Sequence, residues 1–317
     1  MNLPLLYDSN VDRFCGAFNL AGPSSLRSSS SQVFGIFGSN AQNQPPEFRR
    51  CLVPDPGCIF IEVDQASAES RIVAYECRRG VYQEVFENNL NAHAFLASHL
   101  FPHQTDLPLS CYEKSPTELA KLDEWWIYQK HLKKHHKKYY GLSKSSGHGY
   151  SYKMGWRTYQ INVLTITNGE IILDADESKR QLLGVAVTLP EIAENHAQIE
   201  ATVIATGLLH NIFGHPRAFV QRLNDEAIRQ AVNFIPQSSV GLITHMAAIK
   251  FADGSKDTWH LLDSVHDSLL IQAPISEADE AEKFLCDCMR MNLTSTTGNH
   301  YVMEVEATRM AEYWTKE

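Results

Sequence analysis

Apolar positions along the chain follow two different periods, and each period predicts a different kind of element. Residues 59–63 form a short apolar run with β-branched side chains, which predicts a buried strand. The residues that follow have apolar side chains at helical spacing, with Ala68, Ile72 and Tyr75 on one face. Asp64 stands where the predicted strand ends and the helix begins. A carboxylate there lies at a sheet edge within reach of a ligand, and the plainer explanation is an N-cap aspartate.

A second informative pattern lies in the last third of the chain. Two apolar runs, residues 260–265 and 268–274, flank His266 and Asp267, which predicts a hairpin with Asp267 at its turn. A polar aspartate is common in turns, so this residue alone indicates little. Together with Asp64, however, it is the second carboxylate at a strand end. Paired aspartates on neighbouring strands can bind two Mg²⁺ ions, which clamp the attacking and leaving oxygens in phosphoryl transfer.

Helical periodicity dominates the rest of the chain, and glycine and proline interrupt it. The helix over 88–101 is expected to start at Asn89 or Asn91. A long polar helix over 118–140 is expected to break or bend at Gly141. Four more helices are expected, over 67–87, over 171–207 with a loop at 189–190, over 224–248 with a break at Pro236, and over 276–293. Residues 102–120 are expected to form a loop, and residues 300–310 a closing strand.

Three residues in the middle of the chain, Lys144, His148 and Tyr152, are spaced by four and share one face if the segment is helical. A cation, an imidazole and an aromatic ring in register suit a nucleotide, with lysine for phosphate and the rings for base and sugar. An ordinary helix surface explains them as well. His93 lies near the predicted start of the 88–101 helix. A helix N-terminus can hold phosphate there, although a lone histidine is more often structural.

Polar residues mark two further stretches. Arg229, Asn233 and Gln237 are spaced by four, a stripe that fits minor-groove and sugar contacts as well as a solvated helix face. Residues 1–50 lack regular periodicity and are rich in serine, which is typical of a flexible linker. Amide and guanidinium side chains are nevertheless dense enough in this region to bind something polar. They are Arg27, Asn40, Gln42, Asn43 and Arg49.

Composition narrows the possible function classes. The chain has 317 residues and is 44% hydrophobic, enough for a large core, and without a signal peptide or a membrane-length apolar stretch it is expected to be soluble and intracellular. Its seven scattered cysteines fit reduced thiols better than a disulfide framework. The net charge of −9 alone argues against nucleic acid. Between Trp125 and Gly169, however, lysines occur without any acid, which fits a basic face for polyphosphate or a solvated lysine-rich helix.

Taken in chain order, these motifs resemble those of the family A DNA polymerases, the family of bacterial repair polymerases and many phage replicases. The resemblance runs from Arg27 to Ser268 and covers most of the chain. The residues that carry it are Asp64, Glu69 and Arg71 in the first signature, Lys144, His148 and Tyr152 in the second, His266, Asp267 and Ser268 in the His-Asp-Glu hairpin, the stripe Arg229, Asn233 and Gln237, the single residue His93, and Arg27 followed by NAQNQP at 40–45.

The resemblance implies an α+β fold, the palm-and-fingers part of a right-hand polymerase without a thumb or exonuclease. An antiparallel palm sheet would hold both aspartates, and a large helical fingers insertion would separate them in the sequence. The implied boundaries are 1–78 and 223–317 for the two parts of the palm and 79–222 for the fingers.

The resemblance also implies a role for each matched residue. Asp64, Asp267 and the backbone carbonyl of Gln65 would bind two Mg²⁺ ions, with Mn²⁺ as a substitute, and Lys144 would join the aspartates in catalysis. The residues that would contact the incoming dNTP are His93, Lys144, His148, Tyr152 and Glu69. The residues that would contact primer-template DNA are Arg27, Asn40, Gln42, Arg229, Asn233, Gln237 and His266.

Three departures from the family pattern bear on activity. Tyr140 stands where the family has an arginine four residues before Lys144, and Lys137 is the residue that we expect to substitute for it. Ser268 replaces the second acid of the hairpin. Residues 65–67 are Gln-Ala-Ser where the family prefers an aromatic residue, serine and glutamine.

The leading hypothesis is a template-directed DNA polymerase that acts in replication or repair in the cytoplasm of a bacterial or phage-infected cell, away from membranes. A separately encoded N-terminal half carrying the thumb and exonuclease is its expected partner. The alternative is a catalytically degenerate remnant that binds primer-template DNA, and the departures motivate it. A third hypothesis is an RNA polymerase of the related single-subunit class, against which Glu69 and the stripe from Arg229 to Gln237 argue.

Overall fold

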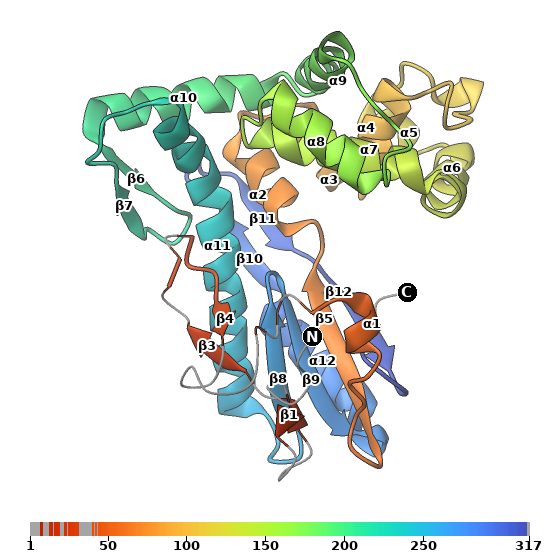
Figure 1. The fold of residues 1–317 in the computed structure, drawn as a ribbon, viewed down its shortest axis with the longest axis vertical. Coiled ribbons are helices and arrows are strands. Elements are labelled where there is room, and N and C mark those ends of the chain that lie inside the picture. The colour runs from red at the N-terminus through yellow and green to blue at the C-terminus, as the bar shows by residue number, and fades with distance from the viewer. Residues whose placement is uncertain are drawn as a thin grey trace.

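The chain forms an antiparallel sheet with one long helix beside it, and a separate group of helices (Figure 1). The computed structural model describes residues 7–8, 13–14, 16–19, 22–23, 25–31, 40, 42 and 44–315. Asn43, which the sequence suggests as a polar contact, lies outside the described residues.

The main sheet has four antiparallel strands in the order β12-β5-β9-β8. These strands are β5 (Cys58–Gln65), β8 (His260–Val265), β9 (Ser268–Pro274) and β12 (Val305–Met310). The predicted first strand and the predicted hairpin are thus confirmed, and they pair with each other directly, from Cys58 opposite Pro274 to Asp64 opposite Ser268. The predicted closing strand is wrong in one respect, because it divides into two strands that belong to different sheets.

The alternation of side chains along β5 gives the sheet two different faces. Ile61 and Val63 are fully buried in the large core, on the face of the sheet that packs against helix α12 (Ala278–Met289). Phe60 points to the opposite face, where it packs in a small cluster with Leu270, Met310 and Trp314. The second face also carries polar residues, and it is therefore the face from which a polar site can be built.

The remaining strands form short two-stranded antiparallel sheets. They are β1 (Tyr7–Asp8), β2 (Arg13–Phe14), β3 (Ala17–Asn19), β4 (Ser29–Ser31), β6 (Leu208–His210), β7 (Pro216–Ala218), β10 (Met291–Thr294) and β11 (His300–Met303).

Helices account for most of the described chain between β5 and β8. The α-helices are α1 (Pro46–Arg49), α2 (Ala68–Glu76), α3 (Val81–Glu87), α4 (Ala92–Leu100), α5 (Pro116–Leu119), α6 (Asp123–His135), α7 (Lys137–Ser151), α8 (Trp156–Ile166), α9 (Ala175–Thr188), α10 (Glu191–Thr206), α11 (Asp225–Gly254) and α12 (Ala278–Met289), with 3₁₀ turns η3 (Leu109–Cys111) and η4 (Ile275–Glu277).

Helix α11 is continuous over 30 residues, so the predicted break at Pro236 is wrong. An internal proline removes one backbone hydrogen bond and costs about 3 kcal/mol in an exposed helix. Pro236 is buried, however, and the helix around it buries Phe234, Val240 and Ile243 in the core. Tertiary packing on several sides of α11 therefore outweighs the local preference to end the helix.

The predicted polar helix over 118–140 also differs from the structure. Its break falls at His136, which has φ −121° and ψ 41°, and α7 continues through Gly141. The glycines of α7 permit close packing, because a Cβ added at Gly147 would lie 2.5 Å from Cδ1 of Leu96 on α4. The predicted start of α4 is confirmed, since the Asn91 side chain accepts the backbone N–H of Ala94 at 2.9 Å.

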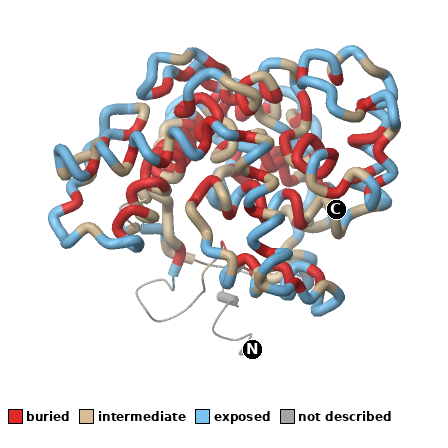
Figure 2. Tube along the Cα trace, turned by 90° about the horizontal axis from the view of Figure 1, so that it is seen from above, coloured by how far each residue is buried: buried red, intermediate tan, exposed pale blue. Residues whose placement is uncertain are grey.

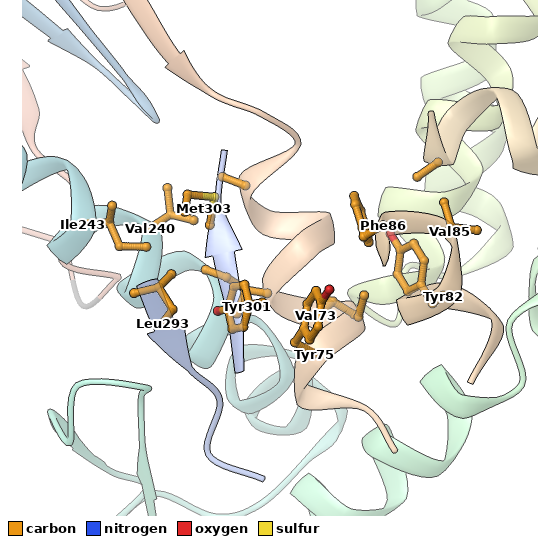
Figure 3. Packing of buried hydrophobic residues seen from close by; sticks show 14 of the residues in the cluster. Val73, Tyr75, Tyr82, Val85, Phe86, Val240, Ile243, Leu293, Tyr301 and Met303 are labelled. Atoms are coloured by element: carbon orange, nitrogen blue, oxygen red, sulfur yellow. The ribbon is translucent and has the colours of Figure 1, made fainter. Parts of the chain in front are cut away.

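One continuous core connects the sheet region to the helices. Figure 3 shows it passing from β10 and β11 across α2 to Phe86 on α3. Tyr75 of α2 and Tyr301 of β11 stack with ring centroids 4.4 Å apart. Buried positions line the interior of both regions, while turns and helix ends are exposed (Figure 2). Helix α2, which follows Asp64, thus packs against β11 on one side and against α3 on the other.

Candidate functional site

The main sheet brings the two predicted metal-binding aspartates to the ends of adjacent strands. Asp64 lies near the end of β5, opposite Ser268 in the register. Asp267 lies in the two-residue turn between β8 and β9, and its carbonyl accepts the backbone N–H of Gln65 at 3.0 Å. Asp64 is therefore part of a strand and does not cap α2, where Ser67 occupies the N-cap position.

Helix α11 supports this strand end from the buried side of the sheet. The Gln65 side chain donates to the hydroxyl of Thr244 at 2.8 Å, and that hydroxyl lies 3.4 Å from the carbonyl of His266. One threonine thus links β5 to the hairpin turn. Carboxylate and carbonyl oxygens are the ligands that Mg²⁺ prefers, so the donor groups gathered at this strand end fit such an ion.

A third carboxylate lies two residues before Asp64, and the sequence reasoning missed it. Glu62 is 2% exposed. Its Oε1 accepts the hydroxyl of Ser268 at 2.8 Å, and its Oε2 accepts the indole N–H of Trp314 at 3.0 Å. Residues two apart on a strand share one face, so Glu62 lies on the same face of β5 as Asp64. A glutamate inside a strand that is otherwise apolar was the signal that could have found it.

Asp263 on β8 is a further buried acid that the sequence reasoning missed. Burial raises its pKa to about 6, and the negative charge of Glu62 acts in the same direction. The backbone N–H of Ser264, 2.7 Å from its carboxylate, and the charge of Arg49 oppose that rise. The hairpin and β5 thus hold several acids on one sheet face, and burial keeps one of them partly protonated near neutral pH.

Four of the predicted contact residues meet at the start of α2. Glu69 forms an ion pair with Arg27 and accepts a hydrogen bond from the hydroxyl of Tyr152. His148 Nδ1 lies 3.7 Å from the same carboxylate, and its ring packs edge-on against Tyr152 at 4.5 Å. Burial raises the pKa of Tyr152, and burial followed by the charges of Arg27 and Lys144 lowers the pKa of His148.

His93 lies in the first turn of α4 and faces cations from neighbouring helices. Burial, followed by the charges of Lys144, His148 and Lys133, lowers its pKa to about 3. Its Nδ1 is buried and has no hydrogen-bond partner among the described residues. The hydroxyl of Ser143 donates to the His93 carbonyl at 2.8 Å, which places Lys144 of α7 next to this turn. The His93 ring therefore has a lowered pKa and a buried nitrogen that forms no hydrogen bond with the described residues.

Tyr140, the residue in the place of the expected arginine, packs against the same turn. Its ring meets that of His93 edge-on at 5.8 Å, and the Asn91 amide donates to its hydroxyl at 3.2 Å. Lys133 of α6 places its Nζ 5.7 Å from the centre of the Tyr140 ring. Lys137 is exposed at the first position of α7. Lys133 is thus the lysine that the described contacts bring to Tyr140, and the sequence reasoning did not single it out.

The predicted DNA-contacting stripe follows one face of α11. Arg229 pairs with Glu226 at 2.7 Å, and Oδ1 of Asn233 is buried without a partner among the described residues. The same spacing continues past Gln237 to Gly241. A Cβ added at Gly241 would lie 2.6 Å from the carbonyl oxygen of Leu26, so this face leads to the segment that carries Arg27.

Gln42 and Asn40 lie beside the β8–β9 hairpin. The Gln42 amide donates to the carbonyl of Ser264 at 2.6 Å and to the hydroxyl of Ser28 at 2.8 Å. Asn40 accepts the backbone N–H of Gln42 at 3.0 Å. The buried Gln42 side chain therefore holds the hairpin in place, whereas His266 at the turn is exposed.

Comparisons with known proteins agree with this arrangement. No family model matches the chain. Over 263 residues, 78% of its length, the chain is 26% identical to DNA polymerase I of Borreliella burgdorferi. Over 301 residues, 90% of its length, it is 23% identical to DNA polymerase I of Chloroflexus aurantiacus. It spans 25% and 28% of the length of these two relatives.

A solved structure supports the fold independently. The polymerase domain of Pol1 from M. smegmatis, solved in complex with a DNA primer-template and dNTP, matches with a TM-score of 0.70 and 19% identity over 98% of this chain and 49% of that one. The expected α+β fold, with its antiparallel sheet and helical insertion, is thereby confirmed. Of the described helices, none combines the length and the apolar character that a membrane crossing requires.

Proposed function

Because the chain is a distant homologue of the polymerase domain of family A DNA polymerases, we propose that it is a template-directed DNA polymerase acting in replication or repair. It would transfer deoxynucleotides from dNTPs to the 3′ hydroxyl of a primer. The observation that supports this most directly is the pairing of β5 with β9, which sets Asp64 and Asp267 at adjacent strand ends. The proposal includes a palm over 1–78 and 223–317, fingers over 79–222, and action where DNA and dNTPs occur, in the cytoplasm.

Asp64, Asp267 and the Gln65 carbonyl are the groups that would hold two Mg²⁺ ions or, in substitution, Mn²⁺. The chemistry that two such ions supply when bound is charge stabilisation at the attacking and leaving oxygens of an in-line phosphoryl transfer. The contribution of the chain would be to hold the backbone at both aspartates in place before the substrate arrives. The hydrogen bonds from the Gln65 N–H to the Asp267 carbonyl and from the Gln65 side chain to Thr244 support that rigidity.

The face shared by α4 and α7 would bind the triphosphate of the incoming dNTP. Lys144 supplies a cation, and the partnerless Nδ1 of His93 supplies a ring nitrogen at the same helix start. Because Tyr140 stands where the family has an arginine, this face has one guanidinium group fewer than the family pattern. Lys133, held over the Tyr140 ring, is the cation that we assign to that role.

The cluster around Glu69 would receive the sugar and the base. Glu69 would contact the sugar and exclude ribose, while Tyr152 and His148 would lie beside the base. These side chains already contact one another in the structure, so their arrangement would be set before the nucleotide binds. Arg27 would reach DNA from the other side of the same carboxylate.

Primer-template DNA would lie along α11 and the hairpin. The residues proposed to contact it are Arg27, Asn40, Arg229, Asn233, Gln237 and His266, with Gln42 acting by holding the hairpin. The buried, partnerless Oδ1 of Asn233 fits this role, because a buried acceptor without a partner is costly unless a ligand satisfies it.

A second candidate function is DNA binding without catalysis. Ser268 in the place of the hairpin's second acid and Tyr140 in the place of an arginine favour it. It predicts salt-sensitive binding of primer-template without metal-dependent incorporation of nucleotides.

Primer extension separates these functions. We expect the purified chain to extend a labelled primer with dNTPs and Mg²⁺, to prefer dNTPs over rNTPs, and to lose extension in Asp64→Ala. Asp253→Ala, which removes an exposed acid at the end of α11, is the matched control and should keep activity. Salt-sensitive DNA binding with no extension under any metal would favour the non-catalytic function, and preferential use of rNTPs would favour an RNA polymerase.

A further inference from the structure

The buried carboxylate of Glu62 lies one hydrogen bond away from the place where the hairpin lacks an acid. Ser268 follows Asp267 directly, and its hydroxyl donates to Glu62 Oε1 at 2.8 Å. We propose that Glu62 is a positioning residue for the aspartate pair and that it replaces, through Ser268, the second acid of the hairpin. This inference rests on the proposed function, since it concerns how the same pair of aspartates holds divalent ions.

The side chain of Glu62 is held on the same sheet face as Asp64. One of its oxygens accepts a hydrogen bond from the Ser268 hydroxyl and the other accepts one from the Trp314 indole, and both of these donors are uncharged. The residue is 2% exposed, so solvent screens its charge only weakly. A negative charge fixed on the same sheet face as Asp64 strengthens the attraction of that strand end for a divalent cation.

The hydrogen bond from Ser268 also fixes geometry. Ser268 pairs with Asp64 in the register and is the first residue of β9. Its hydroxyl lies within 3.1 Å of the Val265 carbonyl as well, at the last position of β8. Through the Ser268 hydroxyl, Glu62 is therefore linked to both sides of the turn that carries Asp267.

A structural role alone would be to hold Trp314 and the C-terminal end of the described chain against the sheet. Trp314→Phe removes that indole hydrogen bond and leaves Ser268 and Glu62 in contact. It is thus the matched control for the positioning role.

The test uses Mn²⁺ binding to the full chain on primer-template, followed by electron paramagnetic resonance, beside the Mg²⁺ dependence of primer extension. We expect Glu62→Gln to weaken Mn²⁺ binding about tenfold or more and to raise the Mg²⁺ concentration needed for half-maximal extension, while Trp314→Phe changes both by less than about threefold. The exchange Glu62→Ser with Ser268→Glu should recover most of the loss, because it returns the acid to the hairpin.

The outcomes distinguish this inference from the proposed function. Unchanged Mn²⁺ affinity in Glu62→Gln, beside a loss in Asp267→Asn, would overturn the role of Glu62 alone. A loss in Trp314→Phe equal to that in Glu62→Gln would reduce Glu62 to a structural anchor. Failure of the wild-type chain to bind Mn²⁺ on primer-template would overturn the proposed function and this inference together.

A separate observation in the helical part points to a transition-metal site. Asp106, His131 and His136 each offer one ligand atom, and the three atoms lie within 4.8 Å of one another. Nε2 of His136 is 3.1 Å from a carboxylate oxygen of Asp106, and the rings of His131 and His136 are 5.2 Å apart. We propose that these residues bind one Zn²⁺ ion, with water completing the coordination.

The chemistry and position of the three residues fit zinc better than Mg²⁺. Two imidazoles and one carboxylate form a donor set that zinc takes in tetrahedral sites. The nearby lysines of α6 oppose a cation, so binding has to come from nitrogen coordination and not from net charge. His136 is the residue at which α6 and α7 separate, and Asp106, with φ +53°, belongs to the loop after α4. A bound ion would therefore fasten this loop to the junction that starts α7.

Competition with a chromophoric zinc chelator tests the site directly. We expect the wild-type chain to take up about one equivalent of Zn²⁺ and to melt at a higher temperature with it. His131→Asn should weaken uptake about tenfold or more, and His210→Asn, an exposed histidine on β6, should not. Wild-type protein that fails to compete with the chelator, or equal uptake by His131→Asn, would overturn the proposal. Neither result depends on polymerase activity.

Discussion

The two halves of the candidate site are built by different kinds of structure. At the acidic strand end, backbone pairing sets the positions, since Asp64 lies opposite Ser268 and Gln65 bonds to Asp267. On the basic helical face, helix packing sets the positions of Lys144 and His93, and Lys144 itself is exposed. Strand register fixes a side chain to a single position, whereas a long lysine side chain can reach the same point from several different turns of a helix.

In the proposed site, each half would compensate for a missing family residue in a different way. Lys133 of α6, which lies over the Tyr140 ring, would replace the absent arginine from another helix. Glu62 of β5, which is hydrogen-bonded to Ser268, would replace the absent acid from the strand that pairs with β9. A change at the acidic end should therefore be costly and sharply position-dependent, and a change on the basic face should be graded.

The largest effect is expected for Asp267→Asn. We expect single-turnover incorporation to fall by about 10³-fold or more, because the carboxylate is lost where charge develops in the transition state, about 4 kcal/mol. Primer-template affinity, measured by fluorescence anisotropy, should stay within about threefold of the wild type. Lys144→Ala should instead raise the KM for dNTP together with a smaller loss of rate. Equal losses in both variants would remove the distinction between the two halves.

A smaller effect is expected for a substitution at Gly241 of α11. This glycine contacts the segment that carries Arg27, which lies between the two halves of the candidate site. A Cβ would lie 2.6 Å from the carbonyl oxygen of Leu26, a backbone atom that cannot rotate away. We expect Gly241→Ala to cost about 1–3 kcal/mol of unfolding free energy in urea and to weaken DNA binding, since the segment of Arg27 must shift. Gly155→Ala, where a Cβ meets no atom within 4 Å, is the control. Equal stability of the two variants would show that the contact is loose.

The sequence predicted the acidic end better than the helical face. The apolar residues at 59–63 and in the hairpin around Asp267 follow patterns that predict strands locally, and in the structure these segments pair as adjacent strands. The cap at Asn91 is likewise local chemistry and was found. The α+β fold followed from motifs in order, although the contacts of Glu62 with Ser268 and Trp314 join residues far apart in the sequence and could not be predicted.

The errors on the helical side arise where packing overrides local preference. Pro236 does not break α11 because the helix is buried around it, and Gly141 does not interrupt α7. The separation falls at His136 instead, a residue without any helix-breaking tendency of its own. The sequence did not single out Lys133 for the same reason, since its contact with Tyr140 depends on how α6 packs against α7.

A graded effect is expected on the basic face at Lys133. We expect Lys133→Ala to raise the KM for dNTP about tenfold, about 1.4 kcal/mol, with little change in DNA affinity. Lys137→Ala removes an exposed lysine from the next helix and should change the KM by less than about threefold. Steady-state primer extension over a dNTP titration measures both. A larger effect of Lys137→Ala on the KM would show that Lys137, as expected from the sequence, takes the role of the missing arginine and that Lys133 does not.

The smallest effect is the pH dependence that His93 confers on stability. Its pKa of about 3 lies below the value near 6.5 of an unfolded histidine, because burial and then the charges of Lys144, His148 and Lys133 disfavour the imidazolium. Below pH 6.5 the unfolded chain binds the proton and the folded chain does not. The stability associated with neutral His93 is therefore fully present above pH 6.5 and is lost as the pH falls toward 3.

Urea unfolding at pH 7.0 and pH 5.5 measures this contribution when wild type and His93→Gln are compared. Between these two values the wild type should lose about 1 kcal/mol more than the variant, since each pH unit below 6.5 costs about 1.4 kcal/mol. The other histidines titrate in both proteins and cancel in the difference, as does Asp263, whose raised pKa acts in the opposite sense. Equal losses of unfolding free energy in the wild type and in His93→Gln would show that the His93 ring is in contact with water. Lys144 and Lys133 would then be the only groups that we assign to the triphosphate on that face.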